Sequence, residues 1–437
     1  MPGSELASRA GSLAAPAAAA PSPSLRASGD NLQPALKEMG NLRLILALNI
    51  AICQQMSLAE SDLEDEEVVQ SAPSPRAVAA LSRYYHTRCA GSAADSRATE
   101  GVCLGLLECR AEGGASIGSC GLLGVCCAVE RSCFSSSALK VSYFVGPSDT
   151  MTTSCSFNVQ VKNPAVCQVR LDFENFNLAQ PTGASTDGQQ YWFGCDTDRF
   201  SVASPYSGNL GFKHLCGRNH GQHMYVPANS TPAMDYLVLR VQLGSERSRV
   251  SWRIKVTQLE CEQPAPPPWA LPSPVLSALN RQLQSLRSET RADLDVLAPP
   301  GCLQYYTNST GTFESFNYDG TAGRYLPELN YAICFKRYPD TCQISYSFED
   351  FQVGAVTGNA NYTNQDCEDA TTYKDYLYIP SVSDSDQGIK FCGNQTSLPI
   401  QVSKSPGPLQ VHFHSNVWRL KIFQQYGFKI HYTTQSC

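Results

Sequence analysis

The sequence has little net charge and no long apolar run beyond its N-terminal part, and each absence excludes a class of function. The 33 Lys and Arg residues oppose 39 Asp and Glu residues, for a formal net charge of −6 at pH 7. Proteins that bind nucleic acid usually carry a basic face or stripe, so we expect no nucleic-acid partner. No stretch after residue 52 is long enough for a membrane helix, so we expect no membrane span in the mature chain.

The motifs of common hydrolases are also missing. No serine stands in a Gly-rich loop with partnered His and Asp, and no His-Glu-x-x-His helix offers a zinc site. His412 and His414 would share one face of a strand, and His214, His220 and His223 would lie in a polar loop, but neither group has further clustered ligands for a metal. We therefore predict a protein that is not an enzyme and uses no cofactor.

Cysteine, by contrast, is abundant, with 19 copies. Intracellular thiols stay reduced, so dense cysteine indicates an oxidising compartment and a secreted, extracellular protein. Residues 42–52 form an apolar run opened by Arg43, which is too short for a bilayer and fits a signal-peptide core, with a small-residue cleavage site at 57–59. The mature chain is expected to start near Glu60, and Met39 is the more natural start of translation. A cytosolic tail with a signal anchor is the alternative.

The signal peptide contains Cys53, and the even number of 18 cysteines that remains favours complete pairing. A catalytic cysteine is therefore not expected. The cysteines fall into three groups of six. The first is Cys89, Cys103, Cys109, Cys120, Cys126 and Cys127, the second is Cys133, Cys155, Cys167, Cys195, Cys216 and Cys261, and the third is Cys302, Cys334, Cys342, Cys367, Cys392 and Cys437.

The second and third groups lie in two repeats. Residues 167–178 align with residues 342–353, Cys216-Gly217 matches Cys392-Gly393, and the last cysteine interval is 45 residues in both repeats. Apolar residues alternate with polar ones inside each repeat, and this period of two predicts strands with one buried face. The alternating residues are Leu237, Leu239, Val241, Leu243, Trp252, Ile254, Val256, Leu409, Val411, Phe413, Phe428, Ile430 and Tyr432. The fold class is therefore all-β, with two antiparallel β-sandwiches and a small disulfide-rich N-terminal module.

These features divide the chain into six parts. Residues 1–59 are the N-terminal extension and signal peptide, 60–83 a flexible acidic and Pro-containing leader, 84–132 the small six-cysteine module, 133–262 the first repeat, 263–300 a Pro-rich linker, and 301–437 the second repeat. Leucines at helical spacing between Leu276 and Leu286 predict a short packed helix in the linker, with a partner-binding helix as the alternative.

Each repeat resembles a CUB domain, a jelly-roll β-sandwich of extracellular proteins. The second repeat carries the resemblance in Ile344–Phe351, Asp375–Ile379, Phe391-Cys392-Gly393 and Gly427–Tyr432, and the first repeat matches more loosely in Asp198–Val202 and Cys216-Gly217. The six-cysteine module is similar to the small module that precedes CUB domains in arthropod secreted proteins, and less closely to clip domains of arthropod proteases. The chain as a whole thus resembles an arthropod secreted CUB-domain protein.

The resemblance implies a pairing of the cysteines in the two repeats. Family pairs would be Cys133–Cys155, Cys195–Cys216, Cys302–Cys334 and Cys367–Cys392, which leaves Cys167–Cys261 and Cys342–Cys437 as additional pairs. A rival scheme bridges the hairpins through Cys155–Cys167 and Cys334–Cys342 and ties together the ends of each domain. Spacing alone does not decide between the two schemes.

Many CUB domains bind calcium, so the resemblance makes calcium a candidate ligand. Asp198 in the first repeat and Asp375 in the second each occupy one acidic position of such a site. Gly354, Ala179 and Asn416 stand where the family usually has further carboxylates. Calcium needs several oxygen ligands, so we expect no metal in either repeat, and Asp375 is the better of the two weak candidates.

Surface residues suggest glycosylation and binding. Asn308, Asn361 and Asn394 begin predicted N-glycosylation sequons, and Asn229 begins a fourth that Pro232 weakens. The basic residues Arg240, Arg247, Arg249, Arg253 and Lys255 are predicted to lie on a solvated outer face, with a site for acidic ligands as the alternative.

The function predicted from the sequence is binding of extracellular proteins or glycans by a secreted, non-enzymatic protein through CUB-like domains. A regulatory cofactor of an extracellular clip-type serine protease cascade is one alternative. A structural component of matrix or cuticle is the other, although the sequence lacks the low-complexity repeats that fibrous matrix proteins often have.

Overall fold

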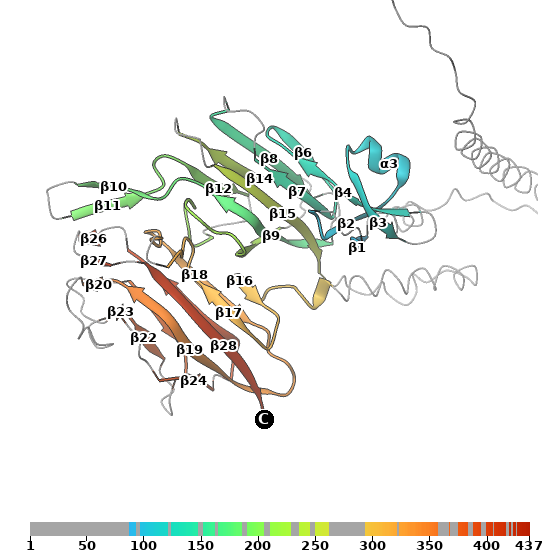
Figure 1. The fold of residues 1–437 in the computed structure, drawn as a ribbon. Coiled ribbons are helices and arrows are strands. Elements are labelled where there is room, and N and C mark those ends of the chain that lie inside the picture. The colour runs from blue at the N-terminus through green and yellow to red at the C-terminus, as the bar shows by residue number, and fades with distance from the viewer. Residues whose placement is uncertain are drawn as a thin grey trace, which may run out of the picture. The chain divides into compact units, whose positions relative to one another are not determined.

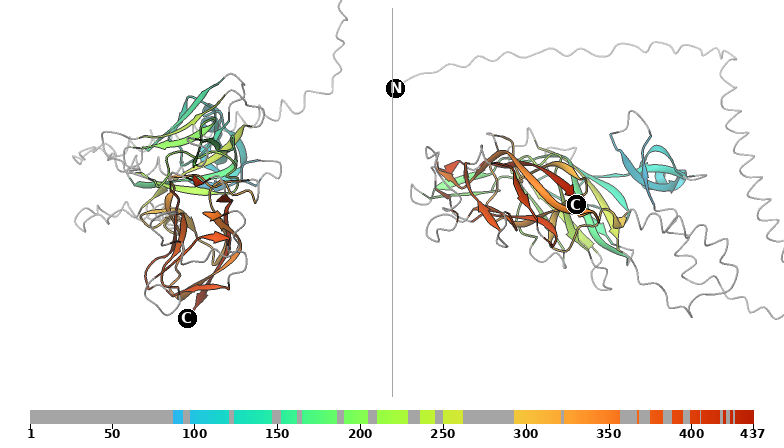
Figure 2. Two further views of the ribbon diagram at one scale, coloured as in Figure 1. Left: turned by 90° about the vertical axis from the view of Figure 1, so that its left-hand side faces the viewer. Right: turned by 90° about the horizontal axis from the view of Figure 1, so that it is seen from below.

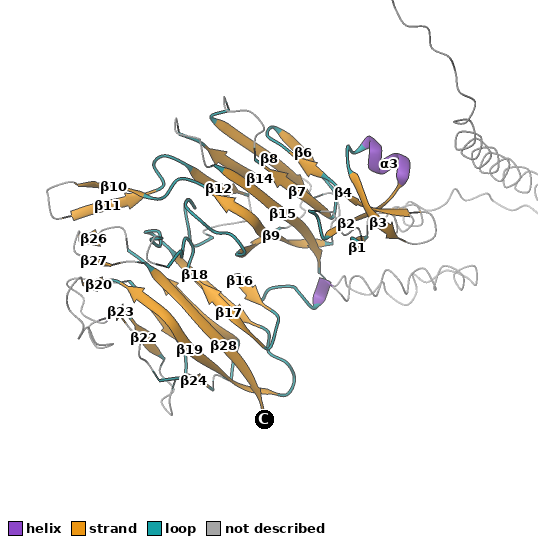
Figure 3. Cartoon of the chain, in the orientation of Figure 1, coloured by secondary structure: helices purple, strands orange, loops and turns teal. Residues whose placement is uncertain are grey.

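The computed structural model describes much of the chain after residue 86. The described residues are 87–92, 97–120, 124–146, 152–161, 165–185, 190–204, 210–228, 236–244, 250–261, 293–320, 323–356, 367, 375–382, 388–394, 399–404, 406–416, 419–420, 423–424 and 426–437. The predicted signal peptide, the leader and the linker helix near 276–286 lie outside these residues. Strands dominate, as Figure 3 shows, so the all-β prediction is confirmed.

The small module is a four-stranded sheet with one short helix. It contains β1 (Arg88–Ala90), β2 (Glu100–Gly105), α3 (Leu106–Ala111), β3 (Ala115–Cys120) and β4 (Gly124–Ala128), with the strand order β1-β2-β4-β3 (Figure 1). Disulfides join Cys89 to Cys126, Cys103 to Cys120 and Cys109 to Cys127. So short a segment buries few apolar side chains, and the three bridges supply the stability that its small core lacks.

Residues 130–260 form two sheets. One has the order β13-β9-β15-β7-β5 and the other β12-β14-β8-β6. Their strands are β5 (Glu130–Arg131), β6 (Ser135–Ser137), β7 (Val141–Val145), β8 (Ser154–Gln160), β9 (Val166–Asn177), β12 (Arg199–Ala203), β13 (His223–Pro227), β14 (Tyr236–Gln242) and β15 (Ser251–Glu260). We call these two sheets the first sandwich. Its strands begin at β5, three residues before Cys133.

Residues 302–437 form the second sandwich, whose two sheets face one another in the left view of Figure 2. One sheet has the order β16-β18-β25-β21-β22, and the other has the order β17-β28-β19-β23 with β24 paired to β19. The strands are β16 (Cys302–Tyr306), β17 (Thr310–Glu314), β18 (Asn330–Phe335), β19 (Thr341–Val353), β21 (Tyr376–Ile379), β22 (Ile389–Phe391), β23 (Gly393–Asn394), β24 (Gln401–Ser403), β25 (Leu409–His414) and β28 (Gly427–Ser436).

Two smaller sheets lie outside the main sheets of the two sandwiches. β10 (Thr182–Ser185) pairs with β11 (Gln190–Gly194), which pairs with β26 (Arg419–Leu420), and β20 (Ala355–Val356) pairs with β27 (Phe423–Gln424). The pairing of β11 with β26 hydrogen-bonds a strand from the first repeat to one from the second.

The two sandwiches share a strand order. In the first, β6 pairs in parallel with β8, which pairs with β14 and then β12; in the second, β16 pairs in parallel with β18, which pairs with β25 and then β21. In the opposite sheets, long strands β9 and β19 pair with the closing strands β15 and β28. The sequence repeat therefore corresponds to a repeat of topology.

The alternating residues form the cores, so the predicted period of two is confirmed. Leu239, Val241, Ile254 and Val256 are fully buried in the first sandwich, and Val411, Phe413, Phe428 and Ile430 are fully buried in the second. Aromatic rings fill much of the second core, where Phe313 packs against Phe335, Tyr346, Phe428 and Tyr432. These rings bury large apolar areas, which stabilise the sandwich.

The sandwiches approach each other closely through two glycines. Gly217 has a φ of +74°, and a Cβ atom at this position would meet Asn317 Oδ1 at 2.0 Å. A Cβ atom at Gly211 would meet the Asn330 carbonyl oxygen at the same distance. Both positions therefore require glycine, and Arg218 N–H donates to Asn317 Oδ1 at 2.7 Å beside them.

Candidate binding surfaces

A buried aspartate directly precedes β21 in the second sandwich. Asp375 is 3% exposed, and its two oxygens accept hydrogen bonds from the Tyr325 hydroxyl at 2.7 Å and the Asn416 backbone N–H at 2.6 Å. The Tyr325 hydroxyl in turn accepts from Gly354 N–H at 2.9 Å. Asp375 thus holds three loops together at one end of the sandwich.

The first sandwich has a matching arrangement around Asp198, which is 1% exposed. Its carboxylate accepts from Ala179 N–H at 2.8 Å and from Gly244 N–H at 2.9 Å. The positions of Ala179 and Gly354 beside the two aspartates agree with the alignment of the repeats. Sequence reasoning missed Tyr325, because a tyrosine far from the aspartate in sequence gives no local signal.

Calcium does not fit the groups at these two corners. Each aspartate meets hydrogen-bond donors, whereas calcium needs several carboxylate or carbonyl oxygens. Among the residues that the structure describes, no three His, Cys, Asp or Glu side chains cluster as metal ligands. The groups described around Asp375 and Asp198 are hydrogen-bond donors that position loops.

Six disulfides staple the two sandwiches. They join Cys133 to Cys155, Cys167 to Cys261, Cys195 to Cys216, Cys302 to Cys334, Cys342 to Cys437 and Cys367 to Cys392. These are the pairs that the CUB resemblance implies. The rival hairpin scheme does not occur, since Cys155 bonds Cys133 and Cys334 bonds Cys302.

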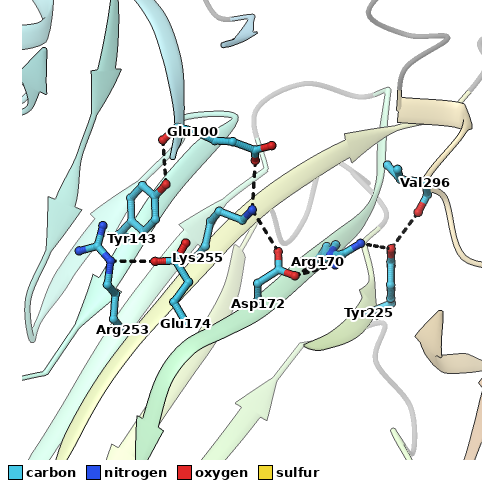
Figure 4. Close-up of polar contacts among 9 residues, drawn as sticks. All are labelled: Glu100, Tyr143, Arg170, Asp172, Glu174, Tyr225, Arg253, Lys255 and Val296. Carbon is cyan, nitrogen blue, oxygen red and sulfur yellow. Dashed lines mark hydrogen bonds and ion pairs between the residues drawn. The ribbon is translucent and has the colours of Figure 1, made fainter. Parts of the chain in front are cut away.

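A row of ion pairs crosses the outer face of the first sandwich (Figure 4). We call it the charge ladder: Glu100, Tyr143, Arg170, Asp172, Glu174, Tyr225, Arg253 and Lys255. Lys255 Nζ lies 3.1 Å from Glu100 of the small module and 3.6 Å from Asp172, and Arg253 Nε donates to Glu174 at 2.8 Å. Arg253 and Lys255 lie on the outer face and alternate with buried residues, as predicted. Their side chains are only 14% and 16% exposed, however, and carboxylates on β2, β5 and β9 pair with both, so this part of the face is not the solvated basic face that was predicted.

The charge ladder ends at the linker. Arg170 donates to the Tyr225 hydroxyl at 2.9 Å, and that hydroxyl donates to the Val296 carbonyl oxygen at 2.9 Å. Lys140 forms a second tie, with its Nζ 2.6 Å from Asp293, which is almost fully buried. Residues 293–298, at the end of the predicted linker, are therefore docked on the first sandwich.

Electrostatic pairing sets the ionisation of the charge ladder. Burial alone would raise the pKa of Asp172, but the Arg170 and Lys255 cations outweigh burial and hold the pKa below its ordinary value. Burial raises the pKa of the Tyr143 phenol, and the nearby Glu174 carboxylate adds to this effect. At neutral pH Asp172 is therefore ionised, whereas the Tyr143 phenol keeps its proton.

His223 lies between the sandwiches, not in a polar loop as predicted. It is the first residue of β13, and its Nε2 lies 2.9 Å from the carbonyl oxygen and 3.0 Å from the amide nitrogen of Tyr305 on β16. Burial, with a contribution from Arg170, lowers the pKa of His223 to about 3. His214 and His220 do lie outside the strands, and His220 is exposed.

The remaining predicted surface residues are partly within the described structure. His412 and His414 lie on one face of β25, as expected, and Phe413 between them is buried. Asn308 and Asn394 are exposed, as glycan acceptors must be, while Asn229 and Asn361 lie outside the described residues. Arg240 is exposed on β14, and Arg247 and Arg249 are not described.

A comparison with protein families identifies part of the chain. The sequence model of the animal CUB domain matches residues 299–435, so this segment is a CUB domain. CUB domains are generally non-catalytic modules that mediate protein interactions. A CUB domain in a chain with nine disulfides is typical of extracellular proteins. Within the described part of the chain, no helix has the length and hydropathy to cross a membrane.

Solved structures that match the chain include two CUB1-EGF-CUB2 fragments. The CUB1-EGF-CUB2 domain of human MASP-1/3 is 12% identical, with a TM-score of 0.21, and the match covers 68% of this chain and 100% of that one. The CUB1-EGF-CUB2 domains of rat MASP-1 are 14% identical, with a TM-score of 0.20, and the match covers 70% of this chain and 99% of that one. No curated protein matches the chain. The assignment rests on the family match, since the TM-scores are low.

Proposed function

We propose that the chain is a secreted, non-enzymatic protein that binds other extracellular proteins through CUB-like domains. The observation that carries this proposal is the family match over residues 299–435, within a sandwich of residues 302–437 that three disulfides staple. Disulfides persist in oxidising compartments, which supports an extracellular site of action. Glycans remain a second class of ligand for the same domains.

The first sandwich is proposed to be a second, more divergent CUB-like domain. Its strand order repeats that of the second sandwich, including the parallel pair β6–β8 that corresponds to β16–β18. Asp198 and Asp375 hold loops at equivalent positions in the two sandwiches. A tandem of two such domains offers two sets of end loops to a partner.

The close approach of the sandwiches supports binding by a preorganised surface. The contacts at Gly211, Gly217 and His223, together with the docked residues 293–298, connect them through backbone groups. A surface fixed before binding loses less conformational entropy when the partner arrives, which favours affinity.

Affinity capture tests this function. The purified, disulfide-intact chain is immobilised, exposed to conditioned extracellular medium and analysed by mass spectrometry, with the reduced and alkylated chain as the matched control. We expect at least one extracellular protein to bind the intact chain alone. Capture of a soluble clip-type protease would favour the cascade-cofactor role, and retention only by insoluble matrix would favour the structural role. If the intact chain retains no protein above the level of the control, the proposal is contradicted.

A further inference from the structure

Five side chains share the outer face of three neighbouring strands in the CUB domain. Tyr376 on β21 stands opposite His414 on β25, and Tyr378 stands opposite both His412 on β25 and Lys390 on β22. The alternate residues on these strands, among them Leu377, Ile379, Val411 and Phe413, are buried in the core. All five outer residues are partly exposed. We call them the tyrosine–histidine face.

The rings on this face hold each other in place. The ring centroids of Tyr376 and His414 are 5.2 Å apart, and those of Tyr378 and His412 are 6.4 Å apart. Tyr378 also lies against Gly388, where an added Cβ atom would come within 2.5 Å of its ring. Packing across a glycine and against a neighbouring ring leaves these side chains little rotamer freedom to lose on binding.

The charge of this face comes from one lysine. Strands β21, β22 and β25 contain no Asp or Glu. Lys390 lies 4.8 Å from the centre of the Tyr376 ring. By contrast, Lys255 on the first sandwich and Lys429 on the opposite sheet of the CUB domain each pair with a carboxylate. The tyrosine–histidine face is thus positive and aromatic, without a carboxylate of its own strands.

We propose that the tyrosine–histidine face binds an acidic segment of a partner protein. This deepens the proposed function and rests on it. Tyrosine is enriched at the energetic centres of protein interfaces, and the lysine beside it favours an approaching carboxylate. A sulfated glycan fits less well, since such polyanions are attracted by clusters of permanent cations and this face has a single lysine.

Selection of displayed peptides tests the proposal with the full secreted chain. A library of random 12-residue peptides is selected on the wild-type chain after depletion on a Lys390→Ala, Tyr378→Ala variant. Recovered peptides are then measured against Lys390→Ala and against the matched control Lys429→Ala, which removes the same charge from the opposite sheet. Melting temperatures of all variants check that each remains folded, and Lys390→Gln provides a second, milder variant.

The expected result is a recovered set enriched in Asp and Glu. Binding of these peptides should weaken about tenfold in Lys390→Ala and remain within about twofold in Lys429→Ala. Recovered peptides without acidic enrichment, or equal losses in both variants, would overturn the proposal. The proposal would also be overturned if heparin bound through Lys390 and no acidic peptide were recovered. It would likewise be overturned if the peptides bound only after zinc was added.

The proposed function and this surface can fail separately. If captured extracellular proteins bind Lys390→Ala and Tyr378→Ala as tightly as the wild-type chain, the function stands and the tyrosine–histidine face is not its site. If the wild-type chain captures no extracellular protein, the proposed function itself fails.

Discussion

His223 gives the contact between the sandwiches a predictable response to acid. The neutral imidazole fits between the backbone groups of Tyr305, and protonation would place a charge in a fully buried site. In the unfolded chain the imidazole titrates near its ordinary pKa of 6.5, whereas burial lowers the folded value to about 3. The stability that this histidine contributes is therefore complete above about pH 6.5 and is lost as the pH falls toward 3.

The magnitude follows from the displacement of the pKa. Each unit between the folded and unfolded values corresponds to about 1.4 kcal/mol, so acidification from pH 7.5 to 4.5 should remove about 3 kcal/mol through His223. His223→Gln retains a donor and an acceptor for Tyr305 but cannot be protonated. This variant should therefore lose about 3 kcal/mol less stability than the wild-type chain over the same pH range.

Urea denaturation followed by intrinsic fluorescence, with disulfides intact, measures this difference. His220→Gln is the matched control, because His220 is exposed and lies in the loop just before β13. The control should follow the wild-type pH dependence, and His412 and His214 contribute equally to all three proteins. If the unfolding free energy of His223→Gln falls as steeply as that of the wild-type chain between pH 7.5 and 4.5, the buried neutral histidine is not the cause of the acid sensitivity.

Three further predictions concern other parts of the chain. Replacing both Cys367 and Cys392 with Ala should lower the free energy of unfolding by about 2–5 kcal/mol. Millimolar calcium or chelator should leave the melting temperature of the wild-type chain unchanged. A calcium-dependent rise of several degrees would refute the loop-positioning role of Asp375. Lys255→Met should cost about 1–3 kcal/mol, because Glu100 loses its cation and Asp172 loses one of two. Glu349→Gln in an exposed pair should cost less than about 1 kcal/mol. Equal costs would contradict a stabilising role of the charge ladder. A glycosidase should increase the gel mobility of the secreted protein through glycans at Asn308, Asn361 and Asn394, and unchanged mobility would refute this.

Local patterns in the sequence were sufficient to predict the strands and the cores. Alternation at Leu239–Val241 and Phe428–Ile430 directly reflects the two faces of a strand, and those residues are buried. The aligned motifs also placed Asp198 and Asp375 at corresponding positions. Each of these signals lies within a few residues of chain, which is why it is readable without a structure.

Pairing over long distances was not predictable. Lys255 and Glu100 are 155 residues apart in sequence, so Lys255 gave only the signal of a polar outer residue on a strand. Gly217, Asn219 and Gly221 precede His223, and these residue types favour turns, so the local sequence does not show that a strand begins at His223. The docking of residues 293–298 depends on a buried ion pair between Asp293 and Lys140, and no local sequence pattern predicts this pair.

Cross-linking of the intact chain to a captured extracellular protein, followed by mass spectrometry, tests whether the CUB domain contacts the partner. We expect cross-links from residues within 299–435, the segment that matches the CUB domain, and their disappearance when the chain is reduced and alkylated. Cross-links confined to the small module at residues 87–128, or persistence of the same cross-links in the reduced chain, would contradict binding through the folded CUB domain.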